Sequence, residues 1–141
     1  MNSFKKIIIG KGNSSKEILT SNRKSKKFFS HTIKKKFILN KKKKILEVSS
    51  SYLISEINKK LEKRKLEFPI RAGADITIGG AISSNVHGKD SFKIGNIYHN
   101  LLSIKLKLTD NKIIEIGRKN NLFNFIVSGY GLIGIILSAK F

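Results

Sequence analysis

The chain lacks cysteine and tryptophan, and it has one proline among its 141 residues. Without cysteine it can form neither disulfides nor thiolate metal sites. Its three histidines, His31, His87 and His99, are too scattered to indicate a zinc site, so we expect no bound metal. Aromatic residues make up 9% of the chain, and no aromatic-rich strand of the RNA-binding type is present. This length fits one domain with a single core.

Long hydrophobic runs are also absent. The apolar run near the N-terminus is short and is interrupted by Gly10 and Lys11. The C-terminal run, residues 131–141, is too short to cross a bilayer. We therefore expect neither a secretory signal nor a transmembrane segment, and we expect a cytoplasmic protein.

Acidic residues are scarce, since 9 Asp and Glu stand against 29 Lys and Arg, a formal net charge of +20. Such an imbalance raises the hypothesis of a partner such as nucleic acid or an anionic membrane. However, lysine, isoleucine and asparagine are over-used together, as AT-rich coding produces, and the lysines come in runs between the expected elements. We therefore interpret most of the charge as solvated surface and expect no nucleic-acid partner, with a basic nucleic-acid-binding protein kept as an alternative.

Apolar spacing in the first half predicts short strands. We expect a strand at Lys6–Ile9, a loop with a short strand over residues 16–36, and two strands around a lysine turn at 41–44.

The segment that follows predicts the clearest helix of the chain. Ser50 or Ser51 is expected to cap it, and Pro69 is expected to end it. Its apolar residues fall on one face, with lysines and glutamates opposite. These apolar residues are Leu53, Ile54, Ile57 and Leu61.

The second half predicts a β-hairpin over residues 102–117, because apolar and polar residues alternate there. Residues 120–141 predict a short capped helix, a glycine loop and a final strand. Helices and strands therefore mix without regular alternation, which indicates the α+β class.

Three glycine loops lie beside expected strands, at residues 10–15, 79–88 and 128–134. Glycine lets a backbone adopt positive φ and approach a ligand closely, and exposed turn amides bind anions. We expect Gly80 to need such open space and positive φ. None of the loops has the spacing of a P-loop or of the Rossmann fingerprint.

The order of the glycine loops, together with the residues that flank them, resembles the pattern of a known protein family. The stretch "RAGADITIGGAISSNVHGKD" is followed by "GNIYHNLLSIKLKLTDNKIIEI" and then by "NLFNFIVSGYGLIGIILSAKF". This arrangement resembles the PCMH-type FAD-binding domain of the vanillyl-alcohol-oxidase flavoprotein family. It is most similar to the decaprenylphosphoryl-ribose oxidase-like FAD-linked oxidoreductases. The resemblance covers residues 6–141 and implies an FAD cofactor.

The resemblance also implies the residues that contact FAD. The first loop and the start of the middle loop would hold the pyrophosphate, the end of the middle loop would approach the flavin, and the last loop would close over the ribose and adenine. In that order these residues are Gly10, Lys11, Gly12, Asn13 and Ser14; Gly79, Gly80, Ala81, Ser84 and Asn85; His87, Gly88 and Lys89; and Gly131, Gly134, Ile135 and Ile136.

Departures from the family pattern carry information as well. Many relatives attach FAD covalently through a first-loop histidine, but this chain has Asn13 there, which implies non-covalent FAD. The usual Asn-His-His after the middle loop is replaced by Asp90, Ser91 and Phe92. The usual Pro-Gly-Thr is Ala-Gly-Ala at 72–74. The resemblance therefore assigns no catalytic residue.

By this resemblance the domain has two lobes, a smaller one over about 1–70 and a larger one over about 71–141. It lacks most of the family's N-terminal strand and helix and the whole substrate, or cap, domain, which a separate chain could carry. The implied reaction is FAD-dependent oxidation of an alcohol group on a sugar-like or polyprenyl-phosphate-sugar substrate. We expect the chain to be inactive alone, and a non-catalytic flavin-binding module is the second alternative.

Overall fold

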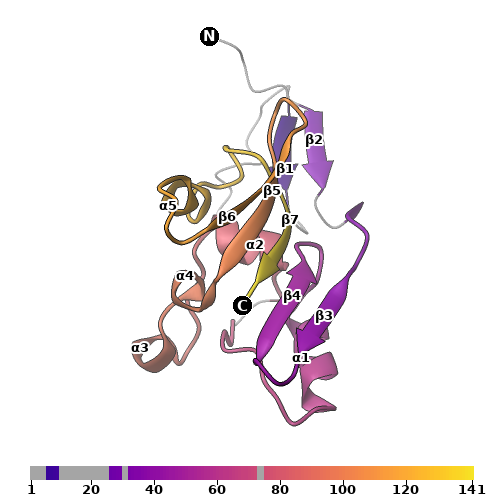
Figure 1. The fold of residues 1–141 in the computed structure, drawn as a ribbon, viewed down its shortest axis with the longest axis vertical. Helices are drawn as coiled ribbons and strands as arrows, with labels where there is room; N and C mark the ends of the chain where they lie inside the picture. The colour runs from indigo at the N-terminus through magenta and orange to yellow at the C-terminus, as the bar shows by residue number, and fades with distance from the viewer. Residues whose placement is uncertain (1–5, 10–25, 30–31, 73–74) are drawn as a thin grey trace.

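A computed structural model of the chain describes residues 6–9, 26–29, 32–72 and 75–141. Helices and strands mix within these residues, which confirms the α+β class (Figure 1). In chain order they are β1 (Lys6–Ile9), β2 (Lys26–Phe29), β3 (Phe37–Asn40), β4 (Ile45–Ser49), α1 (Ile54–Glu62), α2 (Ile78–Ser83), α3 (Ser91–Ile94), α4 (Ile97–Asn100), β5 (Ser103–Lys107), β6 (Ile113–Gly117), α5 (Leu122–Ile126) and β7 (Ile135–Lys140).

The larger sheet has five antiparallel strands in the order β3-β4-β7-β5-β6. The hairpins β3–β4 and β5–β6 are those that the alternating pattern predicts, and β7 joins them by pairing with β4 and β5. A separate two-stranded sheet consists of the parallel pair β1–β2. Strands from both sides of residue 70 share the larger sheet, so the lobe boundary expected there does not separate two sheets.

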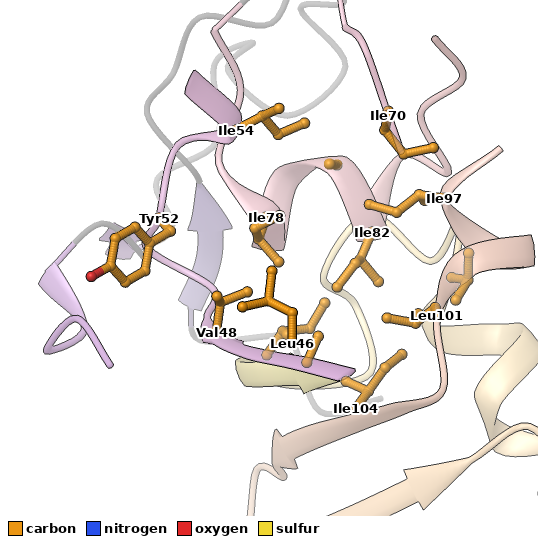
Figure 2. Packing of buried hydrophobic residues seen from close by; sticks show 14 of the residues in the cluster. Leu46, Val48, Tyr52, Ile54, Ile70, Ile78, Ile82, Ile97, Leu101 and Ile104 are labelled. Atoms are coloured by element: carbon orange, nitrogen blue, oxygen red, sulfur yellow. The ribbon is translucent and has the colours of Figure 1, made fainter. Parts of the chain in front are cut away.

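Helix α2 packs on the inner face of the larger sheet and forms the centre of the core (Figure 2). Ile78 and Ile82 are fully buried among the side chains of Val48 on β4 and Ile104 on β5. The Thr77 hydroxyl caps the helix by accepting a hydrogen bond from the third helical amide. The start of the middle glycine loop is therefore helical, because burial and capping outweigh the low helix propensity of its two glycines.

Helix α1 confirms the predicted apolar face, since Ile54, Ile57 and Leu61 are buried. The predicted ends are wrong. The helix begins after Leu53, whose amide donates to the Glu56 carboxylate at 3.0 Å, and not after a capping serine. It ends at Glu62, well before Pro69.

The lysine runs in the described chain lie on exposed surface, as predicted. Lys41–Lys44 form the exposed turn between β3 and β4, and the lysines at the end of α1 and just after it are exposed as well. Lys60 of α1 lies over the Phe37 ring of β3, 5.5 Å from its centroid. No helix within the described ranges is long and apolar enough to cross a membrane.

Candidate functional site

Two of the three predicted loops meet at the C-terminal end of α2. The Tyr130 amide donates to the Ser83 carbonyl at 3.0 Å, and the Ser128 amide donates to the Ile82 carbonyl at 3.3 Å. These bonds fix the last glycine loop against the turn that follows α2. The first loop, with Gly10, Lys11, Gly12, Asn13 and Ser14, lies outside the described residues.

Three of the six non-glycine residues with positive φ in the described ranges lie where these two loops meet. Asn85 has φ +46°, Ser128 has φ +71° and Tyr130 has φ +49°, all in the left-handed region. Gly131, at φ +75°, can adopt this conformation without the steric cost that side chains impose. Strained non-glycine residues cluster at ligand-binding sites, where surrounding contacts hold them in place. The cluster therefore marks this junction as a candidate binding site.

The two glycines of α2 do not offer free amides. The Gly79 amide donates to the Ser50 carbonyl at 2.9 Å, and the Gly80 amide donates to Thr77 Oγ1 at 3.2 Å. The expectation of positive φ at Gly80 is also wrong, because the residue is helical. A Cβ at Gly80 would meet Thr77 Oγ1 at 3.2 Å, a tight contact with the side chain that caps α2.

Polar side chains after α2 have partners in the chain. Ser84 Oγ donates to the Gly80 carbonyl at 2.8 Å. The Asn85 side-chain oxygen accepts from the Tyr98 amide at 3.4 Å, which ties the turn to α4. This arrangement leaves the side-chain NH2 of Asn85 to donate toward a ligand.

The segment from His87 to Lys89 carries both exposed and buried positions. The His87 and Lys89 side chains are exposed, and Gly88 is buried between them. A Cβ at Gly88 would lie 2.8 Å from the Arg71 amide nitrogen, so only glycine fits there.

Charges beside this segment are already paired. The Arg71 guanidinium donates two hydrogen bonds to Glu67, at 2.6 and 2.8 Å, and lies 3.6 Å from the Asp90 carboxylate. The hydrogen bond from Arg71 lowers the pKa of Glu67, and the same bond raises the pKa of Arg71. Arg71 is thus held by carboxylates and is a weaker candidate for a phosphate ligand than exposed Lys89.

Several residues that the sequence predicts as FAD contacts pack inside the protein instead. Ala81 is fully buried, and the Ile136 side chain is 5% exposed within the hydrophobic cluster. A Cβ at Gly134 would lie 2.6 Å from the Lys107 carbonyl oxygen. Ile135 is half-buried and pairs with Lys107 at the start of β7. The Ile136 side chain is therefore not placed to close over a ligand, whereas Ile135 remains a candidate.

Two buried serines are a feature that the pattern of the sequence does not reveal. The Ser50 and Ser51 hydroxyls are buried and have no hydrogen-bond partner in the described structure. The sequence predicts these residues as helix caps, but they precede α1 and lie in the turn that receives the Gly79 amide. A run of three serines after a buried strand is the only signal that could have drawn attention to them.

The candidate site suits an anionic ligand better than a cation. Residues 76–89 and 128–136 contain no aspartate or glutamate. Within the described ranges, no group of His, Asp and Glu side chains could hold a metal ion. A small-residue wall that lacks carboxylates and offers the Asn85 side-chain amide and the Lys89 ammonium as donors suits the pyrophosphate of a dinucleotide.

Comparison with known sequences decides which ligand class this is. The profile of the FAD binding domain family matches residues 28–117, which is more than half of the chain. The chain belongs to the FAD-binding domain family. This PCMH-type domain is found in FAD-linked oxidoreductases, and FAD is its cofactor.

Individual relatives agree with this assignment. The FAD-binding domain is 28% identical over 100 residues to decaprenylphosphoryl-beta-D-ribose oxidase of Mycolicibacterium smegmatis, covering 68% of this chain and 22% of that protein. It is 32% identical over 82 residues to D-lactate dehydrogenase of Archaeoglobus fulgidus, covering 52% of this chain and 18% of that protein. The chain thus spans about a fifth of the length of these relatives.

Proposed function

We propose that the chain binds FAD non-covalently at the junction of α2 with the last glycine loop. The main support for the proposal is the pair of hydrogen bonds that the Ser128 and Tyr130 amides donate to carbonyls at the end of α2. They bring the middle glycine loop, which lies within the matched FAD-binding region, together with the last glycine loop around a strained turn. Asn13 at the usual attachment position supports non-covalent binding, because an amide side chain is not a nucleophile for the flavin ring.

Each part of the site has a proposed role. The Asn85 side chain and the Gly131 backbone would contact the dinucleotide, with Ile135 beside it. His87 and Lys89, both exposed, would lie toward the flavin. The first loop, residues 10–14, would supply further contacts to the pyrophosphate. Gly88 and Gly134 would act indirectly, because each lets the backbone pack closely. Gly79 and Gly80 would act indirectly through the hydrogen bonds that their amides donate to Ser50 and Thr77.

When bound, FAD would accept a hydride from an alcohol carbon of the substrate, and the protein would bind and orient the FAD. We propose a sugar-like or polyprenyl-phosphate-sugar substrate, which is supported by the relative that is named for decaprenylphosphoryl-ribose. The relative named for D-lactate supports only the broader class of hydroxyl-bearing substrates.

The substrate side of the reaction would need residues beyond those that bind FAD. A catalytic base must lie within hydrogen-bond reach of the reacting hydroxyl. In the middle loop the side chains that could exchange a proton are His87 and Lys89. We propose that the base and a closed substrate pocket come from a substrate domain, as a further segment or a separate chain. We also propose a division of the chain near residue 70, in which the smaller part contributes the first glycine loop to the FAD site and the larger part contributes the other two loops.

Replacing Gly80 with valine should weaken FAD binding by about tenfold or more. A side chain there would meet Thr77 Oγ1 at 3.2 Å and the Ile76 side chain at 3.4 Å, so the start of α2 must shift. This shift would move the turn at Ser83, which holds the last loop. The measurement is the FAD dissociation constant by flavin fluorescence titration.

The matched control is Lys42→Glu on the exposed β3–β4 turn. Exposed substitutions change stability by about 0.5 kcal/mol or less, so its FAD affinity should stay within about twofold of the wild type. Equal dissociation constants for Gly80→Val and Lys42→Glu would argue against this location for the FAD site. Circular dichroism spectra of both variants would establish that each is folded.

A further inference from the structure

A strongly basic surface lies where α1 meets the segment before β3. Residues 34–37 and 54–65 carry eight lysines and arginines against two glutamates, and all eight basic residues are exposed. We call this set the α1 basic patch. Its members are Lys34, Lys35, Lys36, Lys59, Lys60, Lys63, Arg64 and Lys65.

Two aromatic rings gather three of these cations at the centre of the patch. The Phe37 and Tyr52 rings pack edge-on, with their centroids 6.1 Å apart. Lys60 Nζ lies 5.5 Å from the Phe37 centroid and 5.9 Å from the Tyr52 centroid. Lys35 Nζ lies 5.3 Å from the Tyr52 centroid, and the Arg64 guanidinium lies 6.0 Å from that of Phe37. Because ring faces attract cations, three like charges are held close together here.

Hydrogen bonds fix the lysine-rich segment against the sheet and against α1. The buried Ser49 hydroxyl of β4 donates to the Lys34 carbonyl at 2.9 Å and accepts from the Lys36 amide at 2.8 Å. The Ser49 amide donates to the Lys36 carbonyl at 3.0 Å. The Lys35 ammonium pairs with the Glu56 carboxylate of α1. The segment and the helix therefore present their charges from fixed backbones. Crowded like charges repel one another in the folded chain, and a polyanion bound to them would offset that repulsion.

A lipid surface suits this patch better than nucleic acid does. Cations lie over both rings and Tyr52 is 7% exposed, so neither ring is free to stack on a base. Seven of the eight basic residues are lysines, which act as point charges, whereas arginine makes bidentate contacts with individual phosphates. Clusters of about four to eight basic residues on an amphipathic helix are typical of binding to anionic lipid headgroups.

We propose that the α1 basic patch binds the surface of an anionic lipid membrane. The binding is electrostatic, because the apolar face of α1 is buried in the core and is not available to insert among acyl chains. The inference goes beyond FAD binding, although the choice of a lipid surface rests in part on the proposed function. A polyprenyl-phosphate-sugar substrate carries a long hydrocarbon chain that partitions into a bilayer, so a domain held at the membrane would meet it there.

The test is sedimentation of the full chain with vesicles. Vesicles of equal parts phosphatidylcholine and phosphatidylserine should bind the chain, and vesicles of phosphatidylcholine alone should not. Raising the salt from about 0.1 M to about 0.5 M should release the chain, because exposed charges are then screened. The variant Lys59→Gln/Lys60→Gln/Lys63→Gln should lower the partition coefficient by about 100-fold.

The matched control is Lys105→Gln/Lys112→Gln/Lys119→Gln. It removes the same charge from exposed positions in or beside β5 and β6, on the side of the sheet away from β3. Its partition coefficient should stay within about threefold of the wild type, since these lysines lie outside the patch.

Equal losses in the two variants would show that net charge binds the vesicles, and would overturn the inference. Binding to duplex DNA without binding to anionic vesicles would overturn it as well. Circular dichroism establishes that each variant is folded, and Lys63→Gln/Lys65→Gln, which keeps Lys60 on its rings, decides by the same readout if the triple variant is not. FAD titration without vesicles tests the proposed function separately, so a chain that binds anionic vesicles but no FAD would overturn that function and support the patch.

Discussion

Replacing Gly129 with alanine is expected to weaken FAD binding by about 100-fold, the largest functional effect of a single methyl group in this chain. A Cβ at this position would overlap the Phe125 carbonyl oxygen and would lie 3.2 Å from the Ile126 carbonyl oxygen. Both obstacles are backbone atoms at the end of α5, so neither can rotate away. The turn must move, and the Tyr130 amide would lose its bond to Ser83.

Gly117→Ala is the control for this prediction. Its Cβ would have the Leu102 carbonyl oxygen as its nearest neighbour at 3.7 Å, which is ordinary contact. Isothermal titration of FAD into both variants is the measurement, with circular dichroism to establish folding. Wild-type affinity in folded Gly129→Ala would show that the last glycine loop does not form the FAD site.

Replacing Phe123 with alanine should lower the free energy of unfolding by about 3–5 kcal/mol. The ring is 0% exposed and packs edge-on against Tyr98, with their centroids 5.7 Å apart. Its loss would leave a cavity between α5 and α4. Because small domains are stable by only about 5–15 kcal/mol, this change would remove a large share of the total.

Phe125→Ala is the matched control for Phe123, since it removes the same side chain from the same helix at a position that is 66% exposed. It should change the free energy of unfolding by about 0.5 kcal/mol or less. Urea unfolding followed by circular dichroism measures both variants. Similar losses for the two would contradict the placement of α5 on the core.

Local pattern predicts the hairpins of this fold because side-chain alternation is visible within a few residues. Ile104 and Leu106 are buried while Lys105 between them is exposed, as a half-buried strand requires. The position of β7 between β4 and β5 is not predictable in this way. It depends on pairs such as Glu47 with Lys140, which are far apart in the sequence.

Helix α2 shows where local pattern fails. Two adjacent glycines predict a loop, but burial of Ile78 and Ile82 and the cap at Thr77 stabilise a helix. The sequence also predicts a capping serine for α1, but Leu53 is the N-cap and the Ser50 carbonyl accepts the Gly79 amide of α2. Neither the burial of α2 nor this long-range hydrogen bond is visible in a short window of the sequence.

The candidate site was predictable in part. The order of the motifs predicts that residues 79–88 and 128–134 belong to one site, and the structure places the two segments together. The structural role of each glycine was not predictable, because it depends on which atoms of the folded chain lie next to that glycine. Gly88 and Gly134 are required by neighbouring carbonyl and amide groups, and this is visible only in three dimensions.

These 141 residues are expected to bind FAD without a covalent bond. The direct measurement is to incubate the purified chain with excess FAD, remove free flavin by gel filtration, and precipitate the protein with acid. We predict a yellow complex with close to one flavin per chain, and all of the flavin in the supernatant after acid. A colourless protein after gel filtration would contradict FAD binding, and flavin retained in the acid pellet would contradict the role assigned to Asn13.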